Sequence, residues 1–247
     1  MVSARSLSNV MHHSNAMENL AMKPSITVAC LGGGPGSDVL GVLDYFMKYM
    51  AGFEGQLNIH LYDREGKWGP CWESLKTAIK AELHDDRVAV SFHDFDVTIA
   101  TADKNKPDLE NADLITMHYF MEEVFSERGK TNVVECFKHI VQTAKPGALF
   151  LYSGMYMYQV INWVHQLLGD KCKLKPTTGP LKREVSKYYK EEFKWISRIK
   201  VNLNEEEDLD LELFDDIKED LETKYDRMEV TYRYNGDVVY RLYQKYK

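Results

Sequence analysis

The chain has 247 residues, of which 44% are hydrophobic and 28% are charged, and its formal net charge is −7. A chain of this length and composition can bury one substantial core, so we expect one domain with an insertion rather than two domains. The negative charge argues against a broad nucleic-acid-binding surface, because such surfaces neutralise phosphate groups with Lys and Arg side chains.

The N-terminal segment, residues 1–24, is predicted to be an arm that ends at Pro24. It lacks the continuous apolar stretch of a secretory signal, and no part of the chain approaches the roughly 20 apolar residues that span a bilayer. The 4 cysteines are scattered without a C-x-x-C pair, which is typical of a reducing compartment and indicates neither disulfides nor a zinc site. We therefore expect a cytoplasmic protein, with a nuclear location left open, that binds no membrane and no metal.

The most informative stretch is 26–40, with the sequence ITVACLGGGPGSDVL. An apolar run that stops abruptly at glycine predicts a buried strand that enters a tight turn. Ser37 and Asp38 then stand where a helix would begin, since both residue types are favoured near helix N-termini. Backbone N–H groups and the helix dipole converge at such a turn, which predicts a binding site for a polar or charged ligand.

The glycine spacing argues against nucleotide phosphates as that ligand. Gly32, Gly34 and Gly36 form G-x-G-x-G, whereas the dinucleotide pattern G-x-G-x-x-G would need glycine at Ser37. A phosphate loop would need Lys followed by Ser or Thr after its last glycine, and that pair is absent. Asp38 would repel a triphosphate, but it can attract the ammonium group of a ligand.

Strands and amphipathic helices alternate along the next hundred residues, which predicts right-handed crossovers and a parallel sheet. The helix at 38–50 has apolar positions at 39, 40, 43, 46, 47 and 50 that should face the sheet. Further strands are predicted at 57–62, ending in Asp63, at 88–92, leading to Asp94 and Asp96, at 112–117, beginning near Asp113, and at 148–152. Further helices are predicted at 72–83, at 131–144 with Thr131 as N-cap, and at 156–168.

The C-terminal third is longer than a minimal fold of this kind requires. We expect an insertion at about 171–225, with basic Lys171–Lys200 followed by acidic Glu205–Glu222. The two runs are either solvated helix faces of opposite sign or, for the basic run, a strip that faces RNA. After the insertion, Asn235-Gly236 between two strand-like runs, 227–233 and 238–243, predicts an antiparallel hairpin.

The region from Ser25 to Gly154 resembles the class I S-adenosylmethionine-dependent methyltransferases. In that family the first strand ends in G-x-G-x-G, the second in an acid that binds the ribose hydroxyls, and the third in an acid near the adenine. The resemblance implies an α/β fold with a mostly parallel seven-stranded sheet, helices on both faces and a C-terminal antiparallel hairpin. It also implies S-adenosyl-L-methionine as the cofactor of a methyltransferase domain at 25–247, over which the N-terminal arm can close.

The same resemblance assigns cofactor contacts to individual residues. Asp63 would bind the ribose hydroxyls, and Trp68 would either stack on the adenine or belong to the core. The family usually has an acid at the position of Cys30 to hold the methionine ammonium group, and Asp38 can replace that charge. At the adenine edge, Asp96 with Val97 is preferred to Asp94 with Phe95. The complete predicted set is Gly32, Gly33, Gly34, Gly36, Asp38, Asp63, Trp68, Asp96, Val97 and Met117.

Residues after the fourth strand face the substrate in this family, which makes His118 and Tyr119 the candidate catalytic residues. His118 can act as a base near neutral pH, or it can be purely structural. Glu122 and Glu123 would begin the following helix, where acidic side chains suit the helix dipole. The N/D-P-P-Y/F motif of amino-methylating relatives is absent, since MHYF has neither proline, and this argues against methylation of adenine N6 or glutamine.

The leading functional hypothesis is methyl transfer to a nitrogen or oxygen atom of a small molecule, favoured by the acidic net charge. The first alternative is an RNA or protein methyltransferase that uses Lys171–Lys200. The second is a catalytically silent cofactor-binding subunit, suggested by Cys30 at the usually acidic position. The oligomeric state stays open.

Overall fold

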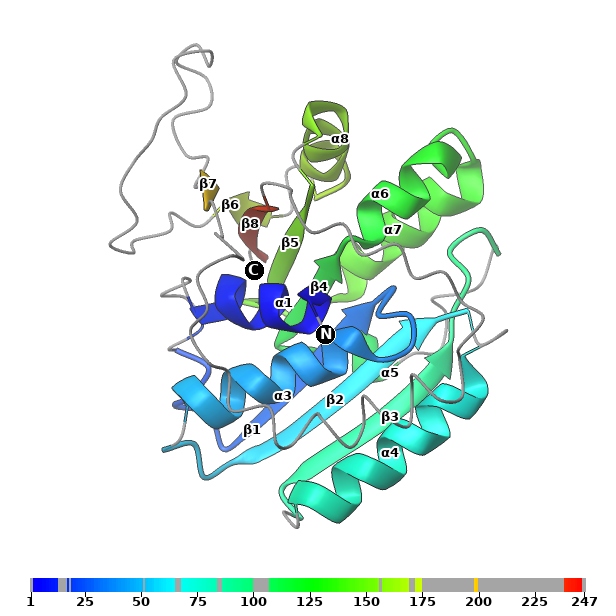
Figure 1. The fold of residues 1–247 in the computed structure, drawn as a ribbon. Helices are drawn as coiled ribbons and strands as arrows, with labels where there is room; N and C mark the ends of the chain where they lie inside the picture. Colours follow the sequence, from blue (N-terminus) through cyan, green and yellow to red (C-terminus); the bar gives the residue numbers. More distant parts are fainter. Residues whose placement is uncertain are drawn as a thin grey trace.

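The computed structural model describes residues 2–12, 17, 19–50, 52–64, 68–83, 86–99, 107–155, 157–168, 172–174, 198–199 and 238–245. Within these residues, eight strands form one sheet (Figure 1). The strands are β1 (Ser25–Leu31), β2 (Gln56–Asp63), β3 (Val88–Asp94), β4 (Leu114–His118), β5 (Leu149–Met155), β6 (Cys172–Leu174), β7 (Arg198–Ile199) and β8 (Val238–Lys245).

The strand order is β3-β2-β1-β4-β5-β8-β6, with β7 also paired to β8. Strands β1 to β5 are parallel, and β8 runs antiparallel to β5, β6 and β7. The chain order reverses between β1 and β4, which is the switch point where open α/β sheets bind ligands at the carboxyl ends of their strands. The predicted mostly parallel sheet is confirmed. The expected partner strand at 227–233 and most of the expected insertion lie outside the described residues.

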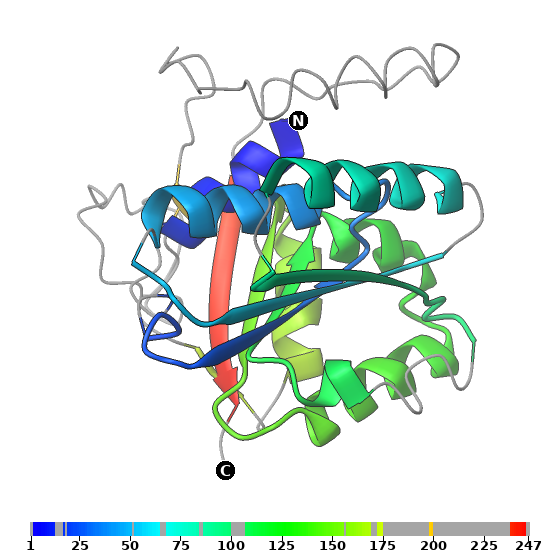
Figure 2. The same cartoon turned by 90° about the horizontal axis from the view of Figure 1, so that it is seen from below.

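Two layers of helices enclose the sheet (Figure 2). One core lies between the sheet and α1, α3 and α4, and the other between the sheet and α6, α7 and α8. No helix in the described part of the chain is both long and apolar enough to cross a membrane. The helices are α1 (Val2–His12), α3 (Ser37–Tyr49), α4 (Gly69–Leu83), α5 (Pro107–Glu110), α6 (Phe120–Val124), α7 (Thr131–Thr143) and α8 (Tyr158–Leu168).

The buried half of strand β1, residues 28–31, shows why this sheet forms from an apolar run. Its side chains alternate between the two cores, with Val28 and Cys30 in the first and Ala29 and Leu31 in the second. A central parallel strand covered on both faces needs apolar residues at every buried position, so no polar alternation remains in this half of β1.

The N-terminal segment contributes to the first core through α1, whose Leu7, Val10 and Met11 are fully buried. Helix α1 packs on α3 at Gly41, where a Cβ atom would lie only 2.7 Å from the carbonyl oxygen of Ala4. Helix α1 therefore lies directly against α3, and this close approach requires a residue without a side chain.

Two local predictions are wrong. Met47 is 48% exposed, because it lies at the rim of the inward face of α3 that carries Leu43 and Phe46. The N-cap of α7 is Lys130 rather than Thr131, and it provides no side-chain cap. The carbonyl oxygen of Lys130 instead accepts hydrogen bonds from the N–H groups of Val133 and Val134.

Asp113, expected at the beginning of the fourth strand, joins β1 to the segments that carry Lys23 and Lys145 at the amino end of the sheet. It forms ion pairs of 2.5 Å with Lys23 and 2.6 Å with Lys145, and it accepts a 2.9 Å hydrogen bond from the N–H of Thr27. Although burial opposes its charge, these partners hold the pKa of Asp113 below its usual range. The role of Asp113 is therefore structural.

Candidate cofactor site

The glycine loop lies between β1 and α3, at the carboxyl edge of the sheet. Gly32 and Gly36 have φ angles of 74° and 114°, a region that L side chains rarely adopt. A Cβ atom at Gly32 would lie 2.1 Å from Cδ2 of Phe120, and one at Gly36 would lie 2.2 Å from Cδ2 of Leu75. Both glycines are required by conformation and by space, which is why the loop can pass so close to its neighbours.

Gly34, at the middle of the loop, is held by hydrogen bonds at both its N–H and its carbonyl group. Its N–H donates to Oδ2 of Asp63 at 2.6 Å, and its carbonyl oxygen accepts from Nε1 of Trp72 at 2.8 Å. The Trp72 ring in turn stacks on Phe92 with centroids 5.3 Å apart. The sequence predicted Asp63 at this edge but not the role of Trp72, whose only signal was an indole at the start of a helix.

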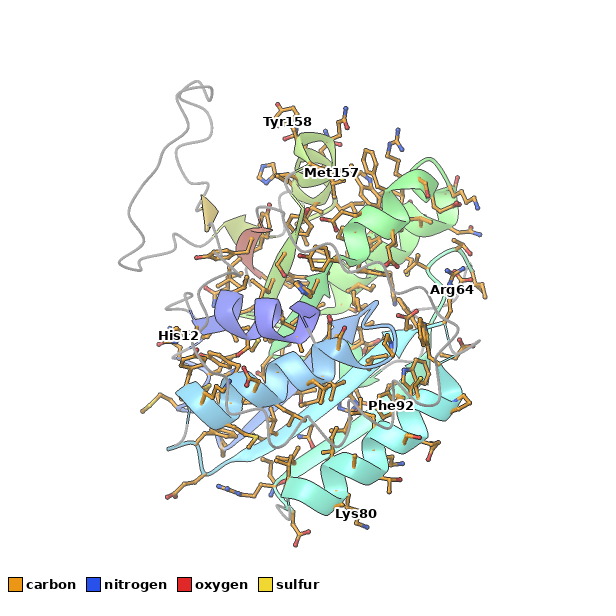
Figure 3. The ribbon with its side chains drawn as sticks, viewed as in Figure 1. His12, Arg64, Lys80, Phe92, Met157 and Tyr158 are labelled. Atoms are coloured by element: carbon orange, nitrogen blue, oxygen red, sulfur yellow. The ribbon has the colours of Figure 1, made fainter. Side chains whose placement is uncertain are left out.

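A cavity of about 550 Å³ opens beside this loop. Six of the ten predicted cofactor residues line it, as do both catalytic candidates. The lining residues are Gly32, Gly33, Gly34, Pro35, Ser37, Asp38, Asp63, Arg64, Trp68, His118, Tyr119 and Glu123. The structure therefore brings the ends of β1, β2 and β4 to one space, and Arg64 extends beyond the end of β2 (Figure 3).

The other four predicted cofactor residues are not in the lining formed by the described residues. Gly36 is the N-cap of α3, and Met117 and Val97 are 2% and 6% exposed within the second core. Asp96 accepts hydrogen bonds from the N–H and the hydroxyl of Thr98 at 2.9 and 2.7 Å. The adenine edge stays a prediction.

The cavity is acidic, and its carboxyl groups disfavour one another's charge. Asp38 is 1% exposed, and its Oδ2 has no hydrogen-bond partner among the described residues. Burial, together with the charges of Asp63 and Glu123, raises the pKa of Asp38 to about 8 against the opposing contact with Ser37. Burial also raises the pKa values of Asp63 and Glu123. Such a group of carboxyls favours a cationic ligand, which would relieve their mutual repulsion.

Cys30, near the end of β1, lies close to the carboxyl group of Asp38. Its thiol is completely buried, and burial and the nearby Asp38 raise its pKa above its ordinary value. The thiol therefore stays neutral near pH 7, and the buried acid at this place in the fold is Asp38, from the helix after the loop.

His118 is the last residue of β4 and is 2% exposed. Its Nδ1 lies 2.7 Å from the hydroxyl oxygen of Ser153, its register partner on β5. Tyr119 follows with a φ angle of 57° and donates its N–H to the carbonyl oxygen of Ser153 at 2.8 Å. A non-glycine residue in this conformation is a form of strain that clusters at functional sites. The sequence did not indicate Ser153, because only the pairing of β4 with β5 brings it to His118.

The strand order, the G-x-G-x-G loop and the acid at the end of β2 together define the fold of a class I S-adenosylmethionine-dependent methyltransferase. A model of the family described as "Putative SAM-dependent methyltransferase" matches residues 1–154, more than half of the chain. The chain belongs to this family of S-adenosylmethionine-dependent methyltransferases. No curated protein sequence matches the chain.

Solved structures are similar to this chain at low sequence identity. NSun6 from Pyrococcus horikoshii, determined with SFG, is 11% identical with a TM-score of 0.51, and the match covers 96% of this chain and 52% of that one. An O-methyltransferase family protein from Burkholderia thailandensis is 18% identical with a TM-score of 0.39, and the match covers 62% of this chain and 38% of that one. An arsenic(III) S-adenosylmethionine methyltransferase from Chlamydomonas reinhardtii is 10% identical with a TM-score of 0.45, and the match covers 90% of this chain and 64% of that one. This chain thus spans less than two thirds of each of these proteins.

Proposed function

We propose that this protein transfers the methyl group of S-adenosyl-L-methionine to a nitrogen or oxygen atom of a small molecule. The observation that carries the proposal is the acidic, glycine-walled cavity, in which buried Asp38 has an oxygen without a hydrogen-bond partner. His118, at the end of β4, lines the same cavity and is the candidate base.

The residues present fit the cofactor in two respects. The cofactor carries positive charge on its sulfur and its ammonium group, and Asp38 offers a buried carboxyl to that charge. The carboxylate of Asp63 accepts one hydrogen bond from Gly34 and one from the N–H of Arg64, both of 2.6 Å. A carboxylate has about four acceptor positions, so Asp63 keeps capacity for the two ribose hydroxyls.

When bound, S-adenosyl-L-methionine supplies a methyl group attached to a positively charged sulfur, and the neutral thioether is a good leaving group. The protein then has to hold the acceptor atom in line at short range, exclude water and remove a proton where the acceptor carries one. His118, whose Nδ1 lies 2.7 Å from the Ser153 hydroxyl oxygen, would accept that proton. Ser153 would fix the orientation of the ring, and Tyr119 would form the wall beside it.

A small-molecule acceptor is favoured by the charge of the site. Asp63 and Glu123 would repel the phosphates of a nucleic acid that approached the cavity, against one cation, Arg64, among the lining residues that the structure describes. RNA remains the second candidate because the net charge is unevenly distributed. Its proposed contact, Lys171–Lys200, lies almost entirely outside the described residues.

The acceptor class can be identified by labelling. The purified chain is incubated with methyl-labelled S-adenosyl-L-methionine and with separate small-molecule, RNA and protein fractions of a cell extract, and the products are analysed by mass spectrometry. Label in the small-molecule fraction, lost with a heat-denatured chain, is the expected result. Label in RNA that disappears at high salt would support the RNA alternative. Cofactor binding by calorimetry without label in any fraction would instead indicate a silent subunit.

A further inference from the structure

A second group of polar side chains lies on the face of the sheet that carries the second core. Side chains alternate along β2, so His60 and Tyr62 project together from the face opposite to that of Leu61. The register pairs His60 with Ser91 and Tyr62 with His93 on β3. The two histidines and the serine therefore share one face.

Helix α5 brings a carboxylate to the same place. Oδ2 of Asp108 lies 3.6 Å from Nδ1 of His60, and Nδ1 of His60 lies 3.3 Å from Nε2 of His93. Donor atoms of all three residues lie within 4.8 Å of one another. In a tetrahedral zinc site with bonds of 2.0–2.1 Å, two nitrogen ligands are about 3.3–3.4 Å apart. The separation of the two imidazole nitrogens matches that value.

We infer that His60, His93 and Asp108 form a binding site for a divalent transition metal, and that zinc is the metal it fits best. Two imidazole nitrogens and one carboxylate are a donor set suited to zinc, whereas calcium and magnesium prefer oxygen ligands alone. Three protein ligands leave the fourth tetrahedral position to water.

Neighbouring groups already hold the donor atoms toward one point. The hydroxyl oxygen of Ser91 lies 2.6 Å from Nδ1 of His60 and 2.9 Å from Nε2 of His93. A hydroxyl has one proton, so it can donate to only one of these nitrogens and must accept from the other. The ring of Tyr62 stacks on His93 with centroids 4.7 Å apart and planes 15° apart, which restricts rotation of that ring.

The site is separate from the cofactor cavity. None of the three donor residues lines the cofactor cavity as formed by the described residues. A metal here would join β2, β3 and α5 just before Asp63, the residue that holds Gly34. The donors lie far apart in the chain and form no spacing motif, which is why the sequence predicted no metal.

The test uses the full chain without an affinity tag, freed of metal with a chelator that is then removed. Zinc chloride is titrated by competition with a coloured chelator, and bound zinc is measured by mass spectrometry after gel filtration. We expect one zinc per chain and a higher Tm with zinc than without it. His60→Gln, His93→Gln and Asp108→Asn should each weaken zinc binding by at least about tenfold.

Two histidines elsewhere, on α7 and α8, provide matched controls. His139→Gln and His165→Gln should leave zinc affinity unchanged. The metal-free Tm reports whether each variant folds. If the histidine variants unfold, the zinc affinity of Asp108→Asn tests the site, because the Asp108 side chain is 46% exposed and its replacement should not disturb the fold. Absence of zinc binding would overturn the inference and leave a hydrogen-bonded cluster. Equal affinity in the wild type and in Asp108→Asn or the double variant His60→Gln/His93→Gln would also overturn it.

Discussion

Oδ2 of Asp63 accepts a hydrogen bond of 2.6 Å from the backbone N–H of Gly34. This bond joins the last residue of β2 to the middle of the loop that follows β1. Residues 29 positions apart are thereby held at the same wall of the cavity. Asp63 thus shapes the loop as well as offering acceptor positions to a ligand.

Asp63→Ala should weaken the affinity for S-adenosyl-L-methionine by about 1–3 kcal/mol, because buried hydroxyl and N–H groups would lose their acceptor. Isothermal titration calorimetry measures the change. Asp86→Ala is the control, since Asp86 is exposed in the turn before β3, at the amino end of that strand and away from the loop. Equal affinities for the wild type and Asp63→Ala would remove Asp63 from the site.

Asp38 should make folding stability depend on pH. Its folded-state pKa of about 8 lies above the value of about 3.9 expected in an unfolded chain, so the folded state binds more protons between these values. The contribution of Asp38 to stability is therefore complete below about pH 4 and decreases as the pH rises towards 8. Urea unfolding at pH 5 and pH 8 measures the difference. Asp38→Asn should show a smaller decrease than the wild type, and an equal decrease would contradict the assignment.

Asp38 should also link cofactor binding to proton release. A cationic ligand favours the ionised carboxylate, so affinity should rise with pH by up to about tenfold per unit below the pKa of about 8 and level off above it. Calorimetry in buffers of different ionisation enthalpy counts the released protons. In Asp38→Asn the pH dependence that remains belongs to other groups, such as Asp63 and Glu123. An unchanged count in this variant would show that Asp38 does not titrate on binding.

Two glycines of the loop should respond differently to alanine. Gly36→Ala should destabilise the fold by about 1–3 kcal/mol, because φ is 114° and its Cβ would lie 2.2 Å from Leu75. At Gly34, where φ is 52°, a Cβ would lie 4.0 Å from Cζ2 of Trp68, so an alanine meets backbone strain but no clash. Gly34→Ala should therefore fold but place its methyl group beside the cavity.

Thermal unfolding and cofactor titration together separate the two cases. We expect Gly36→Ala to lower Tm strongly, and Gly34→Ala to lower cofactor affinity more than Tm. Gly52→Ala is the control, because a Cβ there meets nothing within 4 Å. A Gly34→Ala variant that binds the cofactor as the wild type does would place the ligand away from this loop.

His118→Asn should lower kcat by about 10²- to 10⁴-fold, the usual contribution of a general base, while the cofactor Kd changes little. Ser153→Ala should shift the pH dependence of kcat instead, because it removes the hydroxyl 2.7 Å from Nδ1 of His118. The measurements are kcat across pH and the Kd of the cofactor. If His118→Asn turns over at the wild-type rate at every pH, His118 is structural.

The order of strands and helices was predictable because it depends on local patterns. Apolar runs identified β1 and β5, and amphipathic spacing identified α3, α4, α7 and α8 within a few residues. The two local errors, Met47 and Thr131, concern the rim of a helix and the cap of a helix. Both depend on how the helix ends pack, which a periodic pattern does not contain.

The site was predictable only where one segment carries it. The glycine loop and Asp38 are contiguous in sequence, and the resemblance to a known family added Asp63, Trp68 and His118. The contact between Ser153 and His118 depends on the register of β4 with β5, and the bond between Trp72 and Gly34 depends on the packing of α4. No pattern in either segment encodes such a partner.

The sequence by itself determined the alternating elements, the conformation of the glycine turn and the presence of an acid just after it, because neighbouring residues decide each of these. Only the tertiary structure decided that Asp38 is buried beside Cys30 with a pKa of about 8. It alone also brought His60, His93 and Asp108 together. Burial and distance across a sheet depend on strand order and register, which arise when segments remote in the chain pack against one another.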